Sequence, residues 1–463
     1  MQTRRTFPTR LLRALASVGF LCVAVTALAV IHPDTGDPAA YTTTPGDNSG
    51  WQYQGQWGGF LGTPIARNYF ISAAHIGQAD SVFIFHGETY NVVAGYGDPI
   101  SDLVIWKVDR PFPTYAPLFQ GQGAGDIEVG KELRVFGRGT QRGSEVTLGD
   151  TLRGWLWGPG DGVERWGRNV VSAVVPVSGG APFLRAAFDS PGLPGEAHLS
   201  AGDSGGGLFV LQDGLWRLAG INYGVDDLYA TTNPNSVFYA AVFDARGFYF
   251  RNDDGSFSLI EGSAAVPTSL YSTQISARLD WIKGIVGAGD VAALPAENYD
   301  AWTTAYLTPG QRADDAVGGF NADPDGDGVP NGLEFAFNLD PTFPEPATMT
   351  AGTGLSGLPL VRLENVVGVG PRLTVEFVRR TAASIAGITY AAQFASGLGK
   401  WQTGGTESVT AINGRWERVK VTDPVAPGAA RFARVLVTRI DAALAADGSR
   451  LKAPATKTGS SVP

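Results

Sequence analysis

Short apolar segments separated by turns run from Trp51 to about Gly289, and this pattern constrains the fold of the chain more than any other feature. The segments are too short for buried helices and match the usual length of β-strands, while glycine and proline (62 and 29 residues) supply the turns between them. The pattern predicts an all-β barrel or sandwich. Its clearest segments are Tyr69–Ser72, Ser81–Phe85, Leu103–Val108, Leu133–Phe136, Gly207–Leu211, Leu218–Ile221 and Phe238–Phe243.

The end of this region has the residue spacing of a helix instead of a strand. Ile275, Leu279 and Ile282 have the spacing of one helical face, and Gly287 follows as a stop signal. Residues 350–440 return to strand-like segments, which predict a small β-sandwich. We expect a leader over 1–29, a flexible lead-in over 30–50, the main β domain over 51–289, a linker over 290–343, the sandwich over 344–442 and a disordered tail over 443–463.

Residues 1–29 have the composition of a signal peptide. Four arginines precede an apolar stretch, which ends at Ala27-Leu28-Ala29, a cleavage site of the A-x-A type. The alternative is a membrane anchor, which the shortness of the apolar stretch disfavours. Arg4-Arg5 leaves twin-arginine export open beside the general route. We therefore expect a secreted protein, extracellular or periplasmic, with no transmembrane segment after cleavage.

The composition limits which interactions can stabilise the protein and which partners it can bind. The single cysteine, Cys22, lies within the leader, so the processed chain can form no disulfide bond and depends on core burial or on bound metal. The formal net charge is −9, and an acidic surface argues against a nucleic-acid partner.

One glycine-rich segment, Gly202-Asp203-Ser204-Gly205-Gly206, is typical of a catalytic serine. Glycines on both sides let the backbone turn sharply, so that the N–H groups of Gly202 and Ser204 can converge on one point and form an oxyanion hole. A serine nucleophile also needs a base and a carboxylate that orients the base.

The base and the carboxylate have candidates near the ends of two apolar segments. His75 follows Phe70-Ile71-Ser72-Ala73-Ala74, and Asp102 opens the segment Leu103–Val108. Asp98 is the alternative carboxylate. The order of the chain excludes an α/β-hydrolase, since that fold needs its histidine after the serine and no histidine follows Ser204.

These three segments, Ser-Ala-Ala-His75, Asp102-Leu-Val-Ile and Gly-Asp-Ser204-Gly-Gly, resemble the signature segments of the trypsin/chymotrypsin family, and they occur in that family's order. The resemblance covers residues 51–287 and implies a double β-barrel with a C-terminal helix. It also implies that Asn222-Tyr223-Gly224 is the strand that pairs with an extended substrate.

The chain departs from the family in several ways. It lacks the family's disulfides, and it lacks an Ile-Val-Gly-Gly activation sequence, in whose place stands the segment 50–59. In the family a freed N-terminus pairs with the aspartate before the serine, which is Asp203 in this chain. The sequence leaves the partner of Asp203, and the existence of a zymogen step, open.

Counting back six residues from Ser204, as the family's pattern implies, places His198 at the floor of the S1 pocket. An imidazole there would favour a polar or acidic P1 residue. The alternative is that His198 only supports the loop and that P1 is a medium apolar residue. Both versions predict that the enzyme does not cleave after Arg or Lys.

The linker contains a twelve-position calcium loop, and this loop resembles those of dockerins and thrombospondin type 3 repeats. Oxygen ligands at positions 1, 3, 5, 9 and 12, a glycine at position 6 and a backbone carbonyl at position 7 suit Ca²⁺. The predicted ligands are Asp323, Asp325, Asp327, the carbonyl of Val329, Asn331 and Glu334.

Together these features predict a secreted serine endopeptidase that hydrolyses protein or peptide substrates through an acyl-enzyme, with structural Ca²⁺ in residues 323–334. The alternative is a non-catalytic extracellular binding or adhesion protein on a protease-like fold. The C-terminal module could bind a surface or a carbohydrate.

Overall fold

The computed structural model describes residues 30–121, 128–212, 214–226, 228–232, 236–252, 254–287, 298–344, 348–382, 386–412, 415–427 and 430–440. The predicted signal peptide and the predicted disordered tail lie outside these residues. The chain divides into two compact units. The first comprises residues 1–45, 49–212 and 216–293, and the second comprises 46–48, 213–215 and 294–463.

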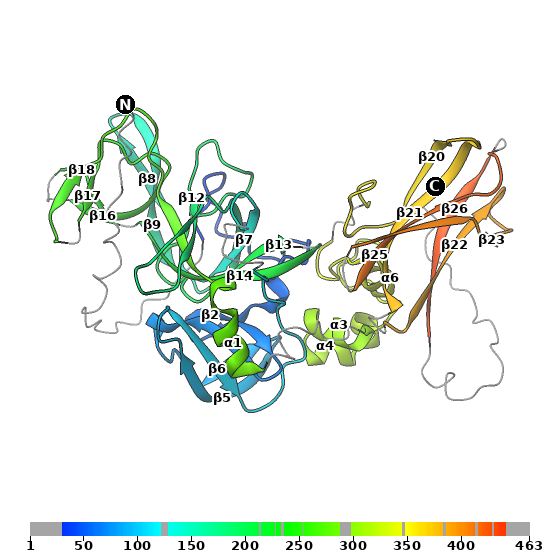
Figure 1. The fold of residues 1–463 in the computed structure, drawn as a ribbon, viewed down its shortest axis with the longest axis horizontal. Coiled ribbons are helices and arrows are strands. Elements are labelled where there is room, and N and C mark those ends of the chain that lie inside the picture. Colours follow the sequence, from blue (N-terminus) through cyan, green and yellow to red (C-terminus); the bar gives the residue numbers. More distant parts are fainter. Residues whose placement is uncertain are drawn as a thin grey trace. The chain divides into compact units, whose positions relative to one another are not determined.

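The first unit begins with a closed barrel of strands in the order β1-β2-β3-β6-β5-β4. Large aromatic side chains fill it, and Trp57, Phe70 and Phe83 are each fully buried. The strands, blue in Figure 1, are β1 (Gly55–Trp57), β2 (Phe60–Ala66), β3 (Tyr69–Ala73), β4 (Val82–Phe85), β5 (Glu88–Gly97) and β6 (Leu103–Val108). Short 3₁₀ turns precede β1 and follow β3, at Trp51–Tyr53 and Ala74–Ile76.

The second half of this unit is built on a seven-stranded sheet in the order β10-β7-β13-β14-β19-β12-β11. Its strands are β7 (Glu132–Gly137), β10 (Arg165–Val170), β11 (Ala173–Val175), β12 (Phe183–Ala187), β13 (Gly207–Gln212), β14 (Leu215–Val225) and β19 (Ser269–Gln274). A further six-stranded sheet contains β8 (Thr140–Leu148), β9 (Thr151–Gly160), β15 (Leu228–Ala230), β16 (Val237–Val242), β17 (Tyr249–Arg251) and β18 (Phe257–Leu259). The closed barrel and the two open sheets confirm the predicted all-β class of this unit.

The predicted helix closes the unit as α1 (Leu279–Val286), after a 3₁₀ turn at Ser276–Arg278. Leu279, Ile282 and Val286 pack into a core that also contains residues of both halves, among them Leu61 and Phe136. This helix therefore fastens the first barrel to the second sheet.

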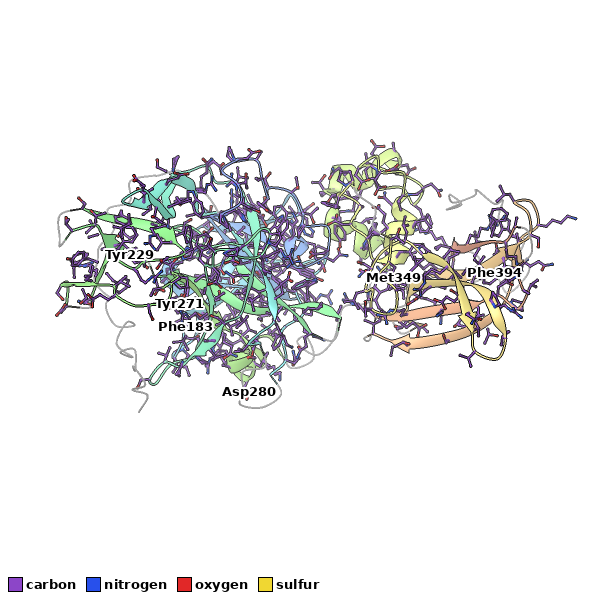
Figure 2. All side chains as sticks on the ribbon, turned by 90° about the horizontal axis from the view of Figure 1, so that it is seen from above. Phe183, Tyr229, Tyr271, Asp280, Met349 and Phe394 are labelled. Carbon is purple, nitrogen blue, oxygen red and sulfur yellow. The ribbon has the colours of Figure 1, made fainter. Side chains whose placement is uncertain are left out.

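The second unit combines short helices with a β-sandwich. The helices are α3 (Tyr299–Tyr306), α4 (Pro309–Ala313), α5 (Asp315–Gly318) and α6 (Asn331–Phe337). Two sheets, β20-β21-β25-β24 and β23-β22-β26, enclose a core that includes Met349 and Phe394, both labelled in Figure 2. The strands are β20 (Leu360–Val366), β21 (Gly370–Arg380), β22 (Ile388–Ala395), β23 (Gln402–Thr403), β24 (Thr406–Ala411), β25 (Trp416–Thr422) and β26 (Phe432–Arg439).

The first residues of the segment predicted as a flexible lead-in, 30–50, are buried. Val30, Ile31 and His32 are 2%, 0% and 4% exposed, and the ring of His32 stacks on Tyr41 with the centroids 3.9 Å apart. Burial of the apolar side chains of Val30 and Ile31 stabilises this start of the segment. The turn-rich composition of residues 33–50 gave no sign of that burial. In the described part of the chain, none of the helices has both the length and the apolar character needed to cross a bilayer.

An ion pair connects α1 to the first barrel. The side chain of Asp98 is fully buried and accepts hydrogen bonds from Arg278 Nε at 2.6 Å and Nη2 at 2.8 Å, and also from the hydroxyl of Ser101. Asp98 therefore serves the attachment of the helix, and the carboxylate that binds His75 is that of Asp102.

We expect Arg278→Ala to lower the free energy of unfolding by about 3 kcal/mol, because it leaves the buried carboxylate of Asp98 without its cation. Urea denaturation of the purified protein measures this change. Asp280→Asn is the control, since Asp280 is exposed on α1 (Figure 2) and should change stability by less than about 0.5 kcal/mol. Equal effects of the two substitutions would contradict the proposed role of the ion pair.

Candidate functional site

Strand pairing brings the predicted base and carboxylate together. β3 and β6 are antiparallel, with Ala73 opposite Leu103, so the end of β3 lies beside the beginning of β6. The backbone N–H of Ala74 donates to the carbonyl of Asp102 at 3.0 Å, which extends the ladder by one step. The next residue, His75, therefore lies within reach of the Asp102 side chain.

The carboxylate of Asp102 holds His75 at two points. His75 Nδ1 lies 2.6 Å from Asp102 Oδ2, and the backbone N–H of His75 donates to Oδ1 at 2.8 Å. A carboxylate can only accept, so Nδ1 carries the proton and Nε2 is left as the basic nitrogen. The His75 side chain is 39% exposed and that of Asp102 is 15% exposed, so the base is accessible while its partner is shielded.

The serine comes from the other half of the unit. Ser204 lies in the loop before β13, and Gly205 and Gly206 on its C-terminal side exchange backbone hydrogen bonds with Asn222 on β14 at 3.0 and 2.9 Å. Ser204 Oγ lies 2.8 Å from His75 Nε2. The structure thus brings together the three predicted residues His75, Asp102 and Ser204, in a continuous chain of hydrogen bonds.

Two backbone amides beside the nucleophile are free to bind an oxyanion. Within the described residues, the N–H groups of Gly202 and Ser204 donate to no protein atom. Gly202 has φ +96°, a backbone conformation that a residue with a side chain rarely adopts. Both residues are half-buried, so a pair of amides without a protein partner at this position is suited to a ligand oxygen.

The segment predicted to pair with substrate divides into residues with different roles. Asn222 is fully buried, and its Nδ2 donates to the carbonyls of Phe136 at 2.8 Å and Asp203 at 3.1 Å. The ring of Tyr223 stands edge-on to that of His75, with the centroids 5.7 Å apart. A Cβ at Gly224 would meet no atom within 4 Å, so the space in front of this residue is open to a substrate chain.

His198 lies inside the protein. It is 0% exposed, its ring is edge-on to Phe188, and its Nδ1 lies 2.7 Å from the carbonyl of Leu199. Burial lowers its pKa to about 4, so the ring stays neutral at ordinary pH. The count from Ser204 therefore placed in the S1 pocket a residue that supports the loop, and the argument for an acidic P1 residue loses its basis.

The carboxylate of Asp203 is an anchor for the serine loop. It is 1% exposed and accepts from Gly139 N at 2.7 Å, from Ser200 N at 2.7 Å and from Val30 N at 3.3 Å. Burial raises the pKa of Asp203 to about 6. Sequence reasoning singled out Asp203 but assigned no role to Val30 or to the side chain of Asn222, because those contacts join segments far apart in the chain.

The predicted calcium loop collects its acidic groups at one place. Asp323, Asp325 and Asp327 each offer a carboxylate oxygen, and the three lie within 4.8 Å of one another. Gly326 and Gly328 have φ +80° and +89°, which the tight loop requires. Burial, with the charges of Asp325 and Asp327 second, raises the pKa of Glu334 to about 9.

Three buried oxygens in this loop have no hydrogen-bond partner among the residues that the structure describes. They are Asp325 Oδ2, Asn331 Oδ1 and Glu334 Oε2. Asn331 uses its Nδ2 to bind the carbonyls of Val317 and Gly319, at 2.8 and 3.0 Å, which leaves its oxygen as the free group. Glu334 is 1% exposed. Hard oxygen donors without hydrogen-bond partners fit a bound Ca²⁺.

No protein-family model and no curated protein matches the sequence. Matching solved structures include human heparin binding protein, with 16% identity, a TM-score of 0.31, and coverage of 52% of this chain and 94% of that one. Kallikrein-related peptidase 10 has 16% identity, a TM-score of 0.28, and coverage of 52% and 98%. The passenger domain of the plasmid encoded toxin of enteroaggregative Escherichia coli has 13% identity, a TM-score of 0.31, and coverage of 50% and 22%. At such values the activity has to follow from the geometry of the side chains.

We expect Asn222→Ala to lower the free energy of unfolding by about 3 kcal/mol, because it removes the side-chain donor from the buried carbonyls of Phe136 and Asp203 and leaves the Asp203 carbonyl only the 3.3 Å bond from the N–H of Gly206. Ser272→Ala is the matched control, since it removes only the 3.1 Å bond to Asn222 Oδ1 and should cost about 1 kcal/mol. Asn222→Ala should also slow the labelling of Ser204 by a fluorophosphonate in the folded fraction. Unchanged labelling there would show that Asn222 stabilises the fold without positioning the serine loop.

Proposed function

We propose that this protein is a secreted serine endopeptidase that hydrolyses peptide bonds through an acyl-enzyme intermediate. The single observation that carries the proposal is the chain of hydrogen bonds from Asp102 through His75 to Ser204, with distances of 2.6 and 2.8 Å. Such a chain makes a serine hydroxyl nucleophilic, because the base that removes its proton is already in contact and correctly oriented.

The proposed reaction uses each group once in acylation and once in deacylation. Ser204 Oγ attacks the scissile carbonyl while His75 Nε2 accepts its proton, and His75 then returns that proton to the leaving amine. Asp102 stabilises the imidazolium that forms. The negative charge on the carbonyl oxygen develops opposite the N–H groups of Gly202 and Ser204. Water repeats the sequence on the acyl-enzyme and releases the acid.

An extended peptide is the substrate that fits this site. The open face at Gly224 adjoins the edge of Tyr223, beside the base. Backbone pairing with β14 would hold the substrate by main-chain hydrogen bonds, which supports cleavage within a polypeptide chain. The partner of the C-terminal sandwich, a surface or a carbohydrate, stays a prediction.

We expect Ser204→Ala to lower turnover of a peptide library by a factor on the order of 10⁶, because the triad acts as a unit. Asp102→Asn should lose a factor on the order of 10⁴, since the imidazole would then take the wrong tautomer. Ser144→Ala, a change at an exposed serine on β8, is the control and should leave turnover unchanged.

A fluorophosphonate probe separates this function from the alternative, a non-catalytic binding protein. Only an activated Ser204 reacts with the probe, so labelling should occur in the parent protein and vanish in Ser204→Ala. Peptidase activity that persists in Ser204→Ala, or a parent protein that does not react with the probe, would contradict the assignment of Ser204 as the nucleophile.

We also propose that residues 323–334 hold a structural Ca²⁺. The three unpartnered oxygens of Asp325, Asn331 and Glu334, which face the same loop as Asp323 and Asp327, support this proposal. Without a cation these carboxylates repel one another and the burial of Glu334 is uncompensated. A bound ion would join α6 to the loop before it and stabilise the second unit.

Calcium should raise the thermal midpoint of the second unit. Extracellular sites bind with dissociation constants of roughly 10⁻⁴–10⁻³ M, and a concentration of 100 times the constant stabilises by about 2.7 kcal/mol. Asp325→Asn combined with Glu334→Gln should abolish binding in calorimetry, whereas Asp315→Asn, an exposed acid outside the loop, should not. A parent protein that binds no calcium at 10 mM, roughly ten times the weakest expected constant, would contradict the proposal.

A further inference from the structure

A pocket of about 400 Å³ lies on the sheet β20-β21-β25-β24 of the second unit. Val375 and Val419 of this sheet belong to the buried core. Their neighbours along the strands, Glu376 and Lys420, therefore point to the other face of the sheet, and these two residues lie opposite each other in the register of β21 and β25. The pocket is thus on the outer face, where small or polar residues line it, among them Gly352, Arg362, Ser408, Thr410 and Arg418.

Two charged side chains build one wall of this pocket. Arg418 donates to the carbonyl of Gly352 from Nη1 at 2.7 Å, and to the carbonyl of Gly354 from Nε and Nη2 at 3.1 and 2.9 Å. Glu376 Oε1 accepts from the N–H of Gly352 at 2.8 Å. The side chains of Arg418 and Glu376 are 14% and 5% exposed. These two residues therefore fasten the loop 352–354 to the sheet and leave little for a ligand.

Two other cations of the pocket keep donors that a ligand can reach. Arg362 uses Nη2 for both Glu364, at 2.6 Å, and Glu376, at 3.2 Å. Within the described residues its Nη1 makes no hydrogen bond. Lys420 contacts Glu364 with its Nζ, which has three hydrogens to donate. The side chains of Arg362 and Lys420 are 37% and 36% exposed, so their remaining N–H groups are accessible.

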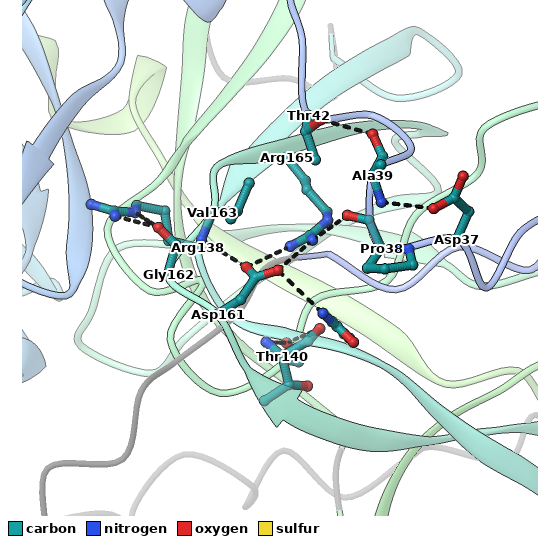
Figure 3. Close-up of polar contacts among 12 residues, drawn as sticks. Asp37, Pro38, Ala39, Thr42, Arg138, Thr140, Asp161, Gly162, Val163 and Arg165 are labelled. Carbon is teal, nitrogen blue, oxygen red and sulfur yellow. Dashed lines mark hydrogen bonds and ion pairs between the residues drawn. The ribbon is translucent and has the colours of Figure 1, made fainter.

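An arginine with a structural role has a different environment in this protein. The side chain of Arg165, in the first unit, is 4% exposed. It pairs with Asp161 at 2.8 Å and donates to the carbonyl of Pro38, as Figure 3 shows. Burial between protein acceptors leaves such a guanidinium to the fold alone. The exposure of Arg362 and Lys420 is what distinguishes them from it.

The pocket carries positive charge in excess, although the chain as a whole has a formal net charge of −9. Three cations meet two carboxylates there, and the groups are Arg362, Arg418, Lys420, Glu364 and Glu376. Within the described residues one positive charge is therefore left over. A ligand with an anionic group would balance this charge and would form charge-assisted hydrogen bonds to the accessible cations.

The other properties of the pocket select among anionic ligands. Its volume lies within the range of small-molecule sites and exceeds the space that an inorganic ion needs. Cations only donate hydrogen bonds and carboxylates only accept them, whereas the hydroxyls of Ser408 and Thr410 do both. Among the described residues, the lining has no large apolar side chain that would select an aliphatic or aromatic ligand. A sugar with a carboxylate offers an acceptor for the cations and hydroxyls for the remaining groups.

We propose that this pocket binds an acidic saccharide, a sugar unit that carries a carboxylate. The carboxylate accepts from Arg362 and Lys420, while ring hydroxyls donate to Glu364 and exchange hydrogen bonds with Ser408 and Thr410. The proposal gives the C-terminal sandwich a ligand of stated chemistry. It does not depend on the peptidase function.

Titration calorimetry of the full chain tests this with trigalacturonate, the neutral galactotriose and acetate as probes. We expect trigalacturonate to bind roughly ten times more tightly than galactotriose, because its carboxylate makes charge-assisted hydrogen bonds. Lys420→Gln, which keeps a donor and loses the charge, should weaken trigalacturonate binding by a factor of roughly 10 and leave galactotriose unchanged. Ser408→Ala should weaken both sugars by the same factor, since a hydroxyl does not distinguish their charge.

Lys400→Gln is the matched control, because Lys400 is an exposed lysine of the same unit outside the pocket, and it should leave every affinity unchanged. Thermal midpoints of the variants, measured beside the parent, separate lost binding from lost folding. Equal affinities for the two sugars, or acetate binding as tight as that of trigalacturonate, would overturn the proposal. So would a parent protein that binds no sugar at about 10 mM, where a site with a dissociation constant of roughly 1 mM is about nine-tenths filled. None of these results bears on the peptidase function, which is tested at Ser204.

Discussion

The geometry of the candidate active site depends on the hydrogen bonds of one buried carboxylate, that of Asp203, which precedes the nucleophile in the chain. Its oxygens accept from Gly139 and Ser200, and its own carbonyl accepts from the side chain of Asn222. Gly137 and Gly139 leave the room that it needs, since a Cβ at Gly137 would lie 2.0 Å from Asp203 Oδ1. Because the loop is fixed from both sides, the amides of Gly202 and Ser204 can remain without partners of their own.

The base and its orienting carboxylate depend on a different constraint, the register of β3 against β6. Pairing of Ala73 with Leu103 places Ala74 beside Asp102, so that the following residue, His75, meets the Asp102 carboxylate. A slip of one residue would turn one of these side chains to the opposite face of the sheet. The closed barrel and the packing of α1 on the core shared with the second sheet keep this register and the serine loop in one rigid unit.

The stability of the second unit depends on a different feature, a cluster of carboxylates beside an apolar core. The unit buries Glu334, a residue of α6, and gathers three aspartates within 4.8 Å of one another, an arrangement that is costly for carboxylates alone. Next to it, the sandwich has an ordinary apolar core, in which Phe337 of α6 joins Val375 and Trp416. A cation in the loop would therefore reach the sandwich through α6. The single cysteine, Cys22, lies in the predicted leader, so such an ion would take the place of a disulfide.

The sequence by itself determined the all-β class, the helix after the barrels and the residues of the triad, because these follow from local signals: apolar periodicity, glycine-rich turns and motif order. It also marked the proposed calcium loop, whose candidate ligands lie within twelve positions of the chain. Only the tertiary structure decided the place of His198, since a count along the chain does not record burial. It alone placed Val30 before Asp203, across 173 positions, because such a contact depends on how distant strands pack and leaves no periodic trace in the residues themselves.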